Sequence, residues 1–159
     1  MDEITSKSVE KVQDTLTQFG LTTKIIQFSA STRTAQDAAD AIGCDVAQIV
    51  KSLIFCTQET HKPILVLTSG INRVNEKVIE QQVGEKIKKA DADFTRTVTG
   101  YAIGGVPPIA HAQKILTFID KDLLQYQQVW AAAGTPHAVF CLNSADLVRL
   151  TGGTIIAVQ

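Results

Sequence analysis

The sequence predicts an α/β protein of the α+β type, in which helices surround a mixed, largely antiparallel sheet that is curved or barrel-like. Short apolar segments with strand character and short amphipathic helices interleave irregularly along the chain. A doubly wound parallel sheet would instead show a steady alternation of strands and helices. The chain has 159 residues, of which 45% are hydrophobic, and it contains no repeat or long linker. We therefore expect a single domain over residues 1–159.

The helices are predicted from apolar spacing and from residues that cap helix ends. Residues 7–19 place apolar side chains at helical spacing and are followed by Gly20. Thr34 is expected to cap a helix that runs through Ile42, and Gly43 is expected to end it. By the same signals, further helices are predicted at 75–82, 91–98 and 143–150, with a short capped turn after residue 45.

The strands are predicted from short runs rich in β-branched and aromatic residues that are bounded by turn residues. Residues 51–56 and 63–69 are expected to pair around a polar turn at 58–62. Residues 101–105 resume an extended path before two prolines that exclude regular helix. The other predicted strands are 24–28, 115–120, 128–133, 137–142 and 154–158.

Composition excludes several classes of function. The formal net charge is −1, whereas proteins that bind long stretches of nucleic-acid backbone are usually strongly basic. We expect no DNA binding and only a small, local contact with a single-stranded end. The polar N-terminus and the lack of a long apolar run predict a cytoplasmic protein without membrane contact. The three cysteines have no metal-ligand spacing, so we expect no metal site.

Two loops rich in glycine and proline contain most of the candidate functional residues. The first is Gly104–Pro108, where the glycines permit a positive φ and a close ligand and the prolines stiffen the exit. His111 follows this loop, and His137 follows the second loop, Gly134–Pro136. The two loops could converge on one cleft. The alternative is that they are ordinary tight turns with turn histidines.

Lys51 is the other candidate. It stands in an apolar segment, and strand alternation places it on the same covered face as Leu53 and Phe55. A lysine there either extends its ammonium to water or fills a cleft that receives an anion. The motifs of P-loop enzymes, zinc proteases and serine hydrolases are absent from the sequence.

Five stretches of the chain resemble the YbaK/EbsC family, also called the prolyl-tRNA synthetase associated domain. They occur in family order and spacing, and they cover nearly the whole chain. Gly-Gly-x-Pro-Pro followed by Gly-x-Pro-His is most similar to the free-standing branch of that family. The stretches are 30–44, 50–55, 65–79, 100–111 and 134–153.

This resemblance implies a hydrolase of carboxylic ester bonds that removes a wrong amino acid from tRNA in trans, without metal or organic cofactor. The implied substrate is tRNA-Pro that carries a small amino acid and presents its acceptor end, with prolyl-tRNA synthetase as a further partner. In relatives, a hydroxyl of the terminal ribose is thought to assist the attacking water. Such catalysis needs mainly positioning, because an aminoacyl ester is already activated.

The resemblance also implies residue roles. Lys51 lines up with the family's functional lysine, which is thought to hold the terminal adenosine phosphate, and Gly105 is the second predicted catalytic residue. Two departures, Pro107 in place of serine and Ala110 in place of glycine, alter the pocket wall. Alternatives are a non-catalytic module that binds a tRNA end or nucleotide, and a domain that docks on a synthetase. The predicted substrate-binding residues are Thr34, Gly104, Val106, Pro107, Pro108, His111, Gly134, Pro136 and His137.

Overall fold

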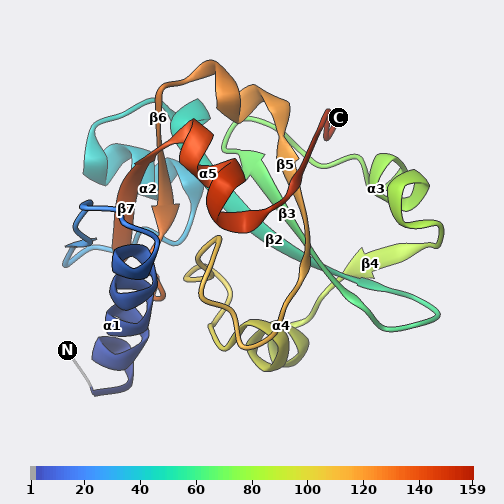
Figure 1. The fold of residues 1–159 in the computed structure, drawn as a ribbon, viewed down its shortest axis with the longest axis horizontal. Coiled ribbons are helices and arrows are strands. Elements are labelled where there is room, and N and C mark those ends of the chain that lie inside the picture. Colours follow the sequence, from blue (N-terminus) through green and yellow to red (C-terminus); the bar gives the residue numbers. More distant parts are fainter. Residues whose placement is uncertain (1–2) are drawn as a thin grey trace.

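The computed structural model describes residues 3–159, which form five α-helices and an eight-stranded sheet (Figure 1). The helices are α1 (Glu3–Gln18), α2 (Ala35–Ile42), α3 (Glu76–Val83), α4 (Ala92–Thr99) and α5 (Ser144–Thr151). The strands are β1 (Ile26–Gln27), β2 (Ile49–Thr57), β3 (Pro63–Ser69), β4 (Ile87–Lys89), β5 (Leu116–Asp120), β6 (Gln128–Ala132), β7 (Ala138–Asn143) and β8 (Thr154–Ile156). Two short 3₁₀ helices span Val46–Gln48 and Lys121–Gln125.

The predicted helix caps are present. The Thr34 side chain accepts a hydrogen bond from the backbone N–H of Asp37, and Gly43 ends α2 in the left-handed conformation with φ 84°. Asp91 caps α4 in the same way through the N–H of Phe94. These contacts satisfy backbone groups that a helix leaves unpaired at its ends, so the sequence determines where these helices begin and end.

The sheet is mixed, as predicted, and β2 lies at its centre. Its strand order is β1-β7-β6-β2-β3-β5-β8, and β4 pairs with β2 beside this path. Four pairings are antiparallel and three are parallel. The sheet is open, with β1 and β8 at its edges, and so it does not close into a barrel.

Three segments differ from the sequence-based prediction. The strand expected at 24–28 is reduced to β1, whose residues are both exposed and therefore gain little from burial. Residues 87–89, within a basic stretch that suggests a solvated surface, instead form β4 against β2. Ile87 is buried while Lys88 and Lys89 remain exposed, so a single apolar side chain anchors this strand. Residues 101–105 form a loop without strand pairing.

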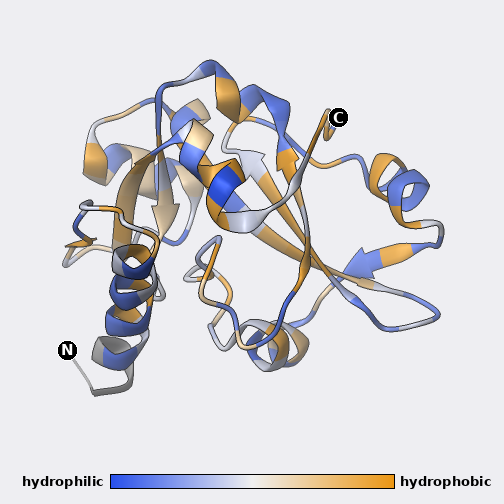
Figure 2. Cartoon of the chain, viewed as in Figure 1, coloured by the Kyte–Doolittle hydropathy of each residue, from blue (hydrophilic) through white to orange (hydrophobic). Residues whose placement is uncertain are grey.

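The core divides between the two faces of the sheet, and β2 contributes to both. Val50 and Ile54 belong to the larger cluster, which also contains α1 residues and Val106. Phe55 belongs to a second cluster with α3. Strand alternation therefore places Ser52 on the first face and Lys51 on the second. Figure 2 shows the hydrophobic residues concentrated on the central strands β2 and β3.

None of the helices in residues 3–159 has the length and apolar character needed to cross a membrane.

Candidate functional site

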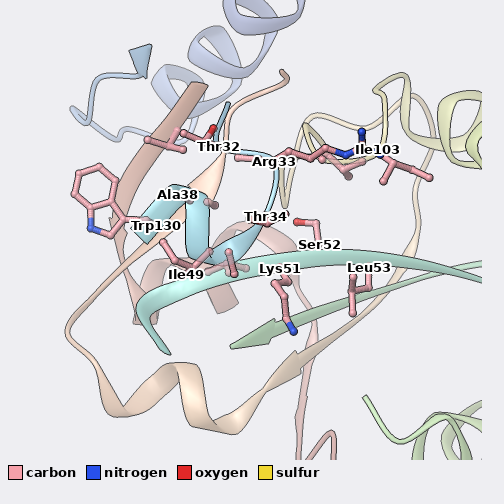
Figure 3. A pocket seen from close by; sticks show the side chains of 17 residues that line it. Thr32, Arg33, Thr34, Ala38, Ile49, Lys51, Ser52, Leu53, Ile103 and Trp130 are labelled. Atoms are coloured by element: carbon pink, nitrogen blue, oxygen red, sulfur yellow. The ribbon is translucent and has the colours of Figure 1, made fainter. Parts of the chain in front are cut away.

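A cavity of about 310 Å³ opens beside the first half of β2 (Figure 3). Its walls come from the segment before α2 together with that helix, from β2, from Ile103, Gly104 and Val106, from β6 and from Val139 of β7, and they are mainly apolar. Among the described residues that line it, those with hydroxyl or charged side chains are Thr32, Arg33, Thr34, Lys51 and Ser52. An apolar recess with a few polar groups at its edge is a common form of small-ligand site.

The two loops rich in glycine and proline touch each other behind this cavity. The backbone N–H of Gly134 donates to the carbonyl of Gly105 at 3.0 Å. A Cβ on Gly105 would lie only 2.8 Å from backbone atoms of Thr135. Gly105 is therefore a packing requirement, because any side chain there would push the two loops apart.

The second loop also holds the segment that leads into α2. Both the N–H and the hydroxyl of Thr32 donate to the carbonyl of Pro136, at 2.6 Å and 3.1 Å. The N–H of Phe28 donates to the carbonyl of His137 at 2.8 Å, and the His137 ring contacts the carbonyl of Ala30 at 3.1 Å. These bonds fix the position of the next two residues, Arg33 and Thr34, at the cavity.

Gly104 lies at the edge of the cavity under the side chain of Arg33. Its φ of 93° is one that residues with a side chain rarely adopt. A Cβ there would lie 2.5 Å from Cγ of Arg33. The absence of a side chain thus lets the Arg33 stem pack directly on the backbone of the loop.

The backbone N–H groups of this loop differ in their partners. The N–H of Gly105 donates to the carbonyl of Ala102 at 3.0 Å. Among the described residues, the N–H groups of Gly104 and Val106 have no hydrogen-bond partner, and both residues line the cavity. Unpaired N–H groups of residues that line a cavity are candidate donors to the carbonyl oxygen of a bound ligand.

Lys51 also lines the cavity, but its side chain leaves β2 on the opposite side from Ser52 and Arg33 (Figure 3). Its ammonium donates to the carbonyl of Asn72 at 2.6 Å. Partial burial lowers the pKa of Lys51, and the positive charges of Arg73 and Lys89 lower it further. The negative charge of Asp120 opposes this change. Its predicted contact with substrate therefore stays a prediction.

A buried polar network continues from Lys51. The side-chain amide of Asn72 donates to Asp120 and to Asp122, each at 2.8 Å. The carboxylate of Asp120 also accepts from the N–H of Ser69 at 3.0 Å, and Asp120 is only 1% exposed. Both N–H donors of the Asn72 side-chain amide thus have carboxylate acceptors, as buried polar groups require.

The other predicted site residues lie around the cavity without lining it. Pro107 and Pro108 are buried, and a ring nitrogen of His111 lies 2.7 Å from the carbonyl of Pro107. Burial lowers the pKa of His111, the contact with Pro107 opposes that change, and the positive charge of Lys11 adds to it. His111 thus braces the far end of the loop. Gly134, Pro136 and His137 support the wall from behind.

The structure brings Thr34, Gly104, Val106 and Lys51 to one cavity and adds three residues that sequence reasoning missed. These are Arg33, Ser52 and Trp130. The hydroxyl of Ser52 is buried and has no hydrogen-bond partner among the described residues. Arg33 could have been noticed as a basic residue directly before a predicted helix cap, but no spacing rule marks it. No group of three or more potential metal-ligating side chains occurs within residues 3–159.

Comparisons with known proteins agree with this geometry. Residues 29–150 match the family described as "Aminoacyl-tRNA editing domain". The chain is 29% identical to YwhH of Bacillus subtilis (strain 168) over 88% of both chains. It is also 30% identical to part of the proline–tRNA ligase of Limosilactobacillus fermentum, over 57% of this chain but only 16% of the ligase.

Solved structures give the same result. The fold is similar to a crystal structure described as "a putative trans-editing enzyme for prolyl tRNA synthetase", with a TM-score of 0.89, 40% identity and 96% coverage of both chains. It is also similar to hypothetical protein APE2540, with a TM-score of 0.86, 30% identity and coverage of 93% and 98%. Because the family match covers most of the chain and includes all the residues that line the cavity, the chain belongs to the aminoacyl-tRNA editing domain family.

Proposed function

We propose that this chain is an aminoacyl-tRNA deacylase that acts in trans on tRNA-Pro carrying a wrong, small amino acid. The main support is the apolar cavity that Gly104 and Val106 border with unpaired backbone N–H groups. The similarity to a putative trans-editing enzyme for prolyl tRNA synthetase and to a segment of a proline–tRNA ligase supports the choice of tRNA. Prolyl-tRNA synthetase is accordingly the proposed protein partner.

The proposed reaction is hydrolysis of the ester between the amino acid and the terminal ribose. Water attacks the carbonyl carbon, and the resulting oxyanion accepts hydrogen bonds from the N–H groups of Gly104 and Val106. The ester bond then breaks, the ribose oxygen leaves with a proton, and free amino acid and intact tRNA are released. Positioning and two donors can supply much of the acceleration, because the ester is already activated.

The cavity wall favours a small apolar side chain. Val106, Ala131 and Val139 line the cavity, while Pro107, which the sequence suggested as the wall, is buried outside it. An apolar wall offers no partner to a hydroxyl, and an unpaired buried hydroxyl is penalised. We expect esters of alanine or 2-aminobutyrate to be hydrolysed faster than the serine ester, by about tenfold.

A deacylation screen tests the proposal. Purified protein is mixed with tRNA-Pro charged with alanine, 2-aminobutyrate, serine or proline, and release of each amino acid is followed over time. We expect the alanyl and 2-aminobutyryl esters to be cleaved first and the prolyl ester to be spared. Equal cleavage of prolyl-tRNA would contradict an editing function. Binding of tRNA without hydrolysis of any ester would favour a non-catalytic module instead.

A further inference from the structure

We infer that Arg33 binds the phosphate of the substrate's terminal nucleotide at the mouth of the cavity. This inference rests on the proposed function and adds the residue that recognises the nucleotide. The aminoacyl end is to enter the apolar recess, but the neighbouring phosphate is ionised and is costly to move away from water. The phosphate must therefore lie at the mouth, where a basic side chain can contact it while both remain partly solvated.

Among the described residues, two basic side chains line the cavity, Arg33 and Lys51. The Lys51 ammonium already donates to the carbonyl of Asn72 and points to the other side of β2. The Arg33 guanidinium is exposed and makes no hydrogen bond or ion pair with any residue between 3 and 159. Of the two, Arg33 has all its donors available to an oxyanion, and its planar group can bind phosphate through two parallel bonds.

The Arg33 stem is held in place before substrate arrives. Its Cγ occupies the space that a Cβ on Gly104 would need, and its Cβ and Cδ lie close to the same point. Its backbone N–H donates to the hydroxyl of Ser31 at 3.2 Å, and the preceding Thr32 is tied twice to Pro136. A side chain that is already partly ordered loses less entropy when it binds a ligand.

Ile103 lies beside Arg33 at the same edge of the cavity (Figure 3). Its side chain is 42% exposed and therefore offers apolar surface at the cavity mouth. Apolar surface next to a free guanidinium matches a nucleotide, which offers a flat apolar base next to a charged phosphate.

The test uses two ligands that differ only in the phosphate. They are the non-hydrolysable amide 3′-alanylamino-3′-deoxyadenosine and the same compound with a 5′-phosphate, and their affinities are measured by calorimetry at fixed ionic strength. We expect the wild-type protein to bind the phosphorylated ligand about fivefold more tightly or better. An exposed ion pair contributes less affinity than this, and a well-formed hydrogen bond between charged groups contributes more. Arg33→Met, which keeps an apolar stem over Gly104, should abolish this preference and leave the affinity for the unphosphorylated ligand unchanged.

Two further variants control the experiment. Arg96→Met removes an exposed arginine on α4, outside the cavity lining, and should keep the full preference. Arg33→Lys should restore part of it, since lysine keeps the charge without the planar group. In hydrolysis of mischarged tRNA, Arg33→Met should raise KM and leave kcat nearly unchanged. Thermal unfolding confirms that each variant is folded.

The outcomes separate this inference from the proposed function. A phosphate preference that survives Arg33→Met, or no preference in the wild-type protein, overturns the role of Arg33 while the deacylase proposal stands. If the wild-type protein binds neither ligand and hydrolyses no mischarged tRNA, both fail. Loss of the preference in Lys51→Met but not in Arg33→Met would transfer the role to Lys51.

Discussion

The two sides of β2 differ in how their polar groups are paired. On the side of Lys51, the ammonium, the amide of Asn72 and the carboxylate of Asp120 form one continuous hydrogen-bonded network, although the buried hydroxyl of Thr68, opposite Lys51 on β3, has no partner among the described residues. On the side of Ser52, the Ser52 hydroxyl and the guanidinium of Arg33 have no partner among the described residues. Both sides contain a basic residue that lines the same cavity.

This difference indicates what each side is for. Buried polar groups that are fully paired hold a structure together, whereas unpaired groups around a cavity are available to a ligand. A positive charge near a cavity is therefore poor evidence of substrate contact until its existing partners are known. The predictions below alter one side at a time.

Gly105→Ala should have the largest effect. A Cβ would meet the Thr135 backbone at 2.8 Å, and backbone cannot move aside as a flexible side chain can. We expect a loss of about 1–3 kcal/mol in unfolding free energy. Displacement of the loop by a fraction of an ångström or more should also slow hydrolysis of every ester by about 100-fold. Denaturant unfolding and the deacylation assay measure the two effects.

Gly84→Ala is the matched control for this variant. Gly84 ends α3 with φ 83° and has no atom within 4 Å of an added Cβ, so alanine there suffers only backbone strain. That strain costs about 1–2 kcal/mol, and Gly84 does not line the cavity. We expect a similar loss of stability with an unchanged rate of hydrolysis. A large loss of rate in Gly84→Ala would mean that instability alone explains the result at Gly105.

Lys51→Met should have a smaller effect, mainly on stability. It leaves the carbonyl of Asn72 without its donor, at a cost of about 1 kcal/mol. The folded protein lowers the pKa of Lys51 below its usual 10.5. Between the lowered pKa and pH 10.5, the unfolded chain therefore binds more protons than the folded protein. The wild-type protein should therefore gain stability as the pH rises toward 10.5 and lose it as the pH falls through the lowered pKa.

Unfolding at several alkaline pH values checks this prediction, since the rise should be weaker in Lys51→Met. The sequence resemblance leads to a different result for the same residue. If Lys51 holds the substrate, a variant of unchanged stability should lose most of its turnover. That outcome would show that the side of β2 that carries Lys51 also takes part in function.

His111 should give the smallest effect. Burial lowers its pKa below the usual 6.5, so the unfolded chain takes up a proton first as the pH falls. Stability from His111 is therefore present above pH 6.5 and is lost as the pH drops through the lowered pKa. In His111→Gln, whose side chain can still donate to the carbonyl of Pro107, stability should fall less between pH 7 and 5. An equal decline in both proteins would contradict this assignment.

Local sequence signals predicted most of the fold. Thr34 and Gly43 mark the ends of α2 because their contacts lie within a few residues of each other. The short strand β4 was missed because its pairing with β2 depends on residues about 30 positions away, at Phe55 and Lys89. Its two lysines are typical of exposed surface, and only Ile87 points into the core.

The candidate site could be predicted only in part. Gly104, which lines the cavity, and Gly105, which packs behind it, were singled out because closely approaching backbone requires glycine at such positions. Strand alternation placed Lys51 and Leu53 on the same face of the strand. It does not say which face of the sheet the Gly104–Pro108 loop covers. Arg33 has no local signature, since its role depends on Gly104, which lies far along the chain. The contact of His111 with Pro107 was not visible in the sequence, so a supporting role for this predicted substrate-binding residue could not be foreseen.

The hydrogen bonds from Thr32 to Pro136 also determine when the site can form during protein synthesis. They join residues 104 positions apart, and the His137 contact with Ala30 spans 107. A nascent chain that has not reached Pro136 lacks the hydrogen bonds that hold the segment before α2. Contacts of such long range also slow folding, because the entropy of closing the intervening loop is lost first. The cavity therefore cannot be complete before the chain has been made as far as Val139, the last residue that lines it.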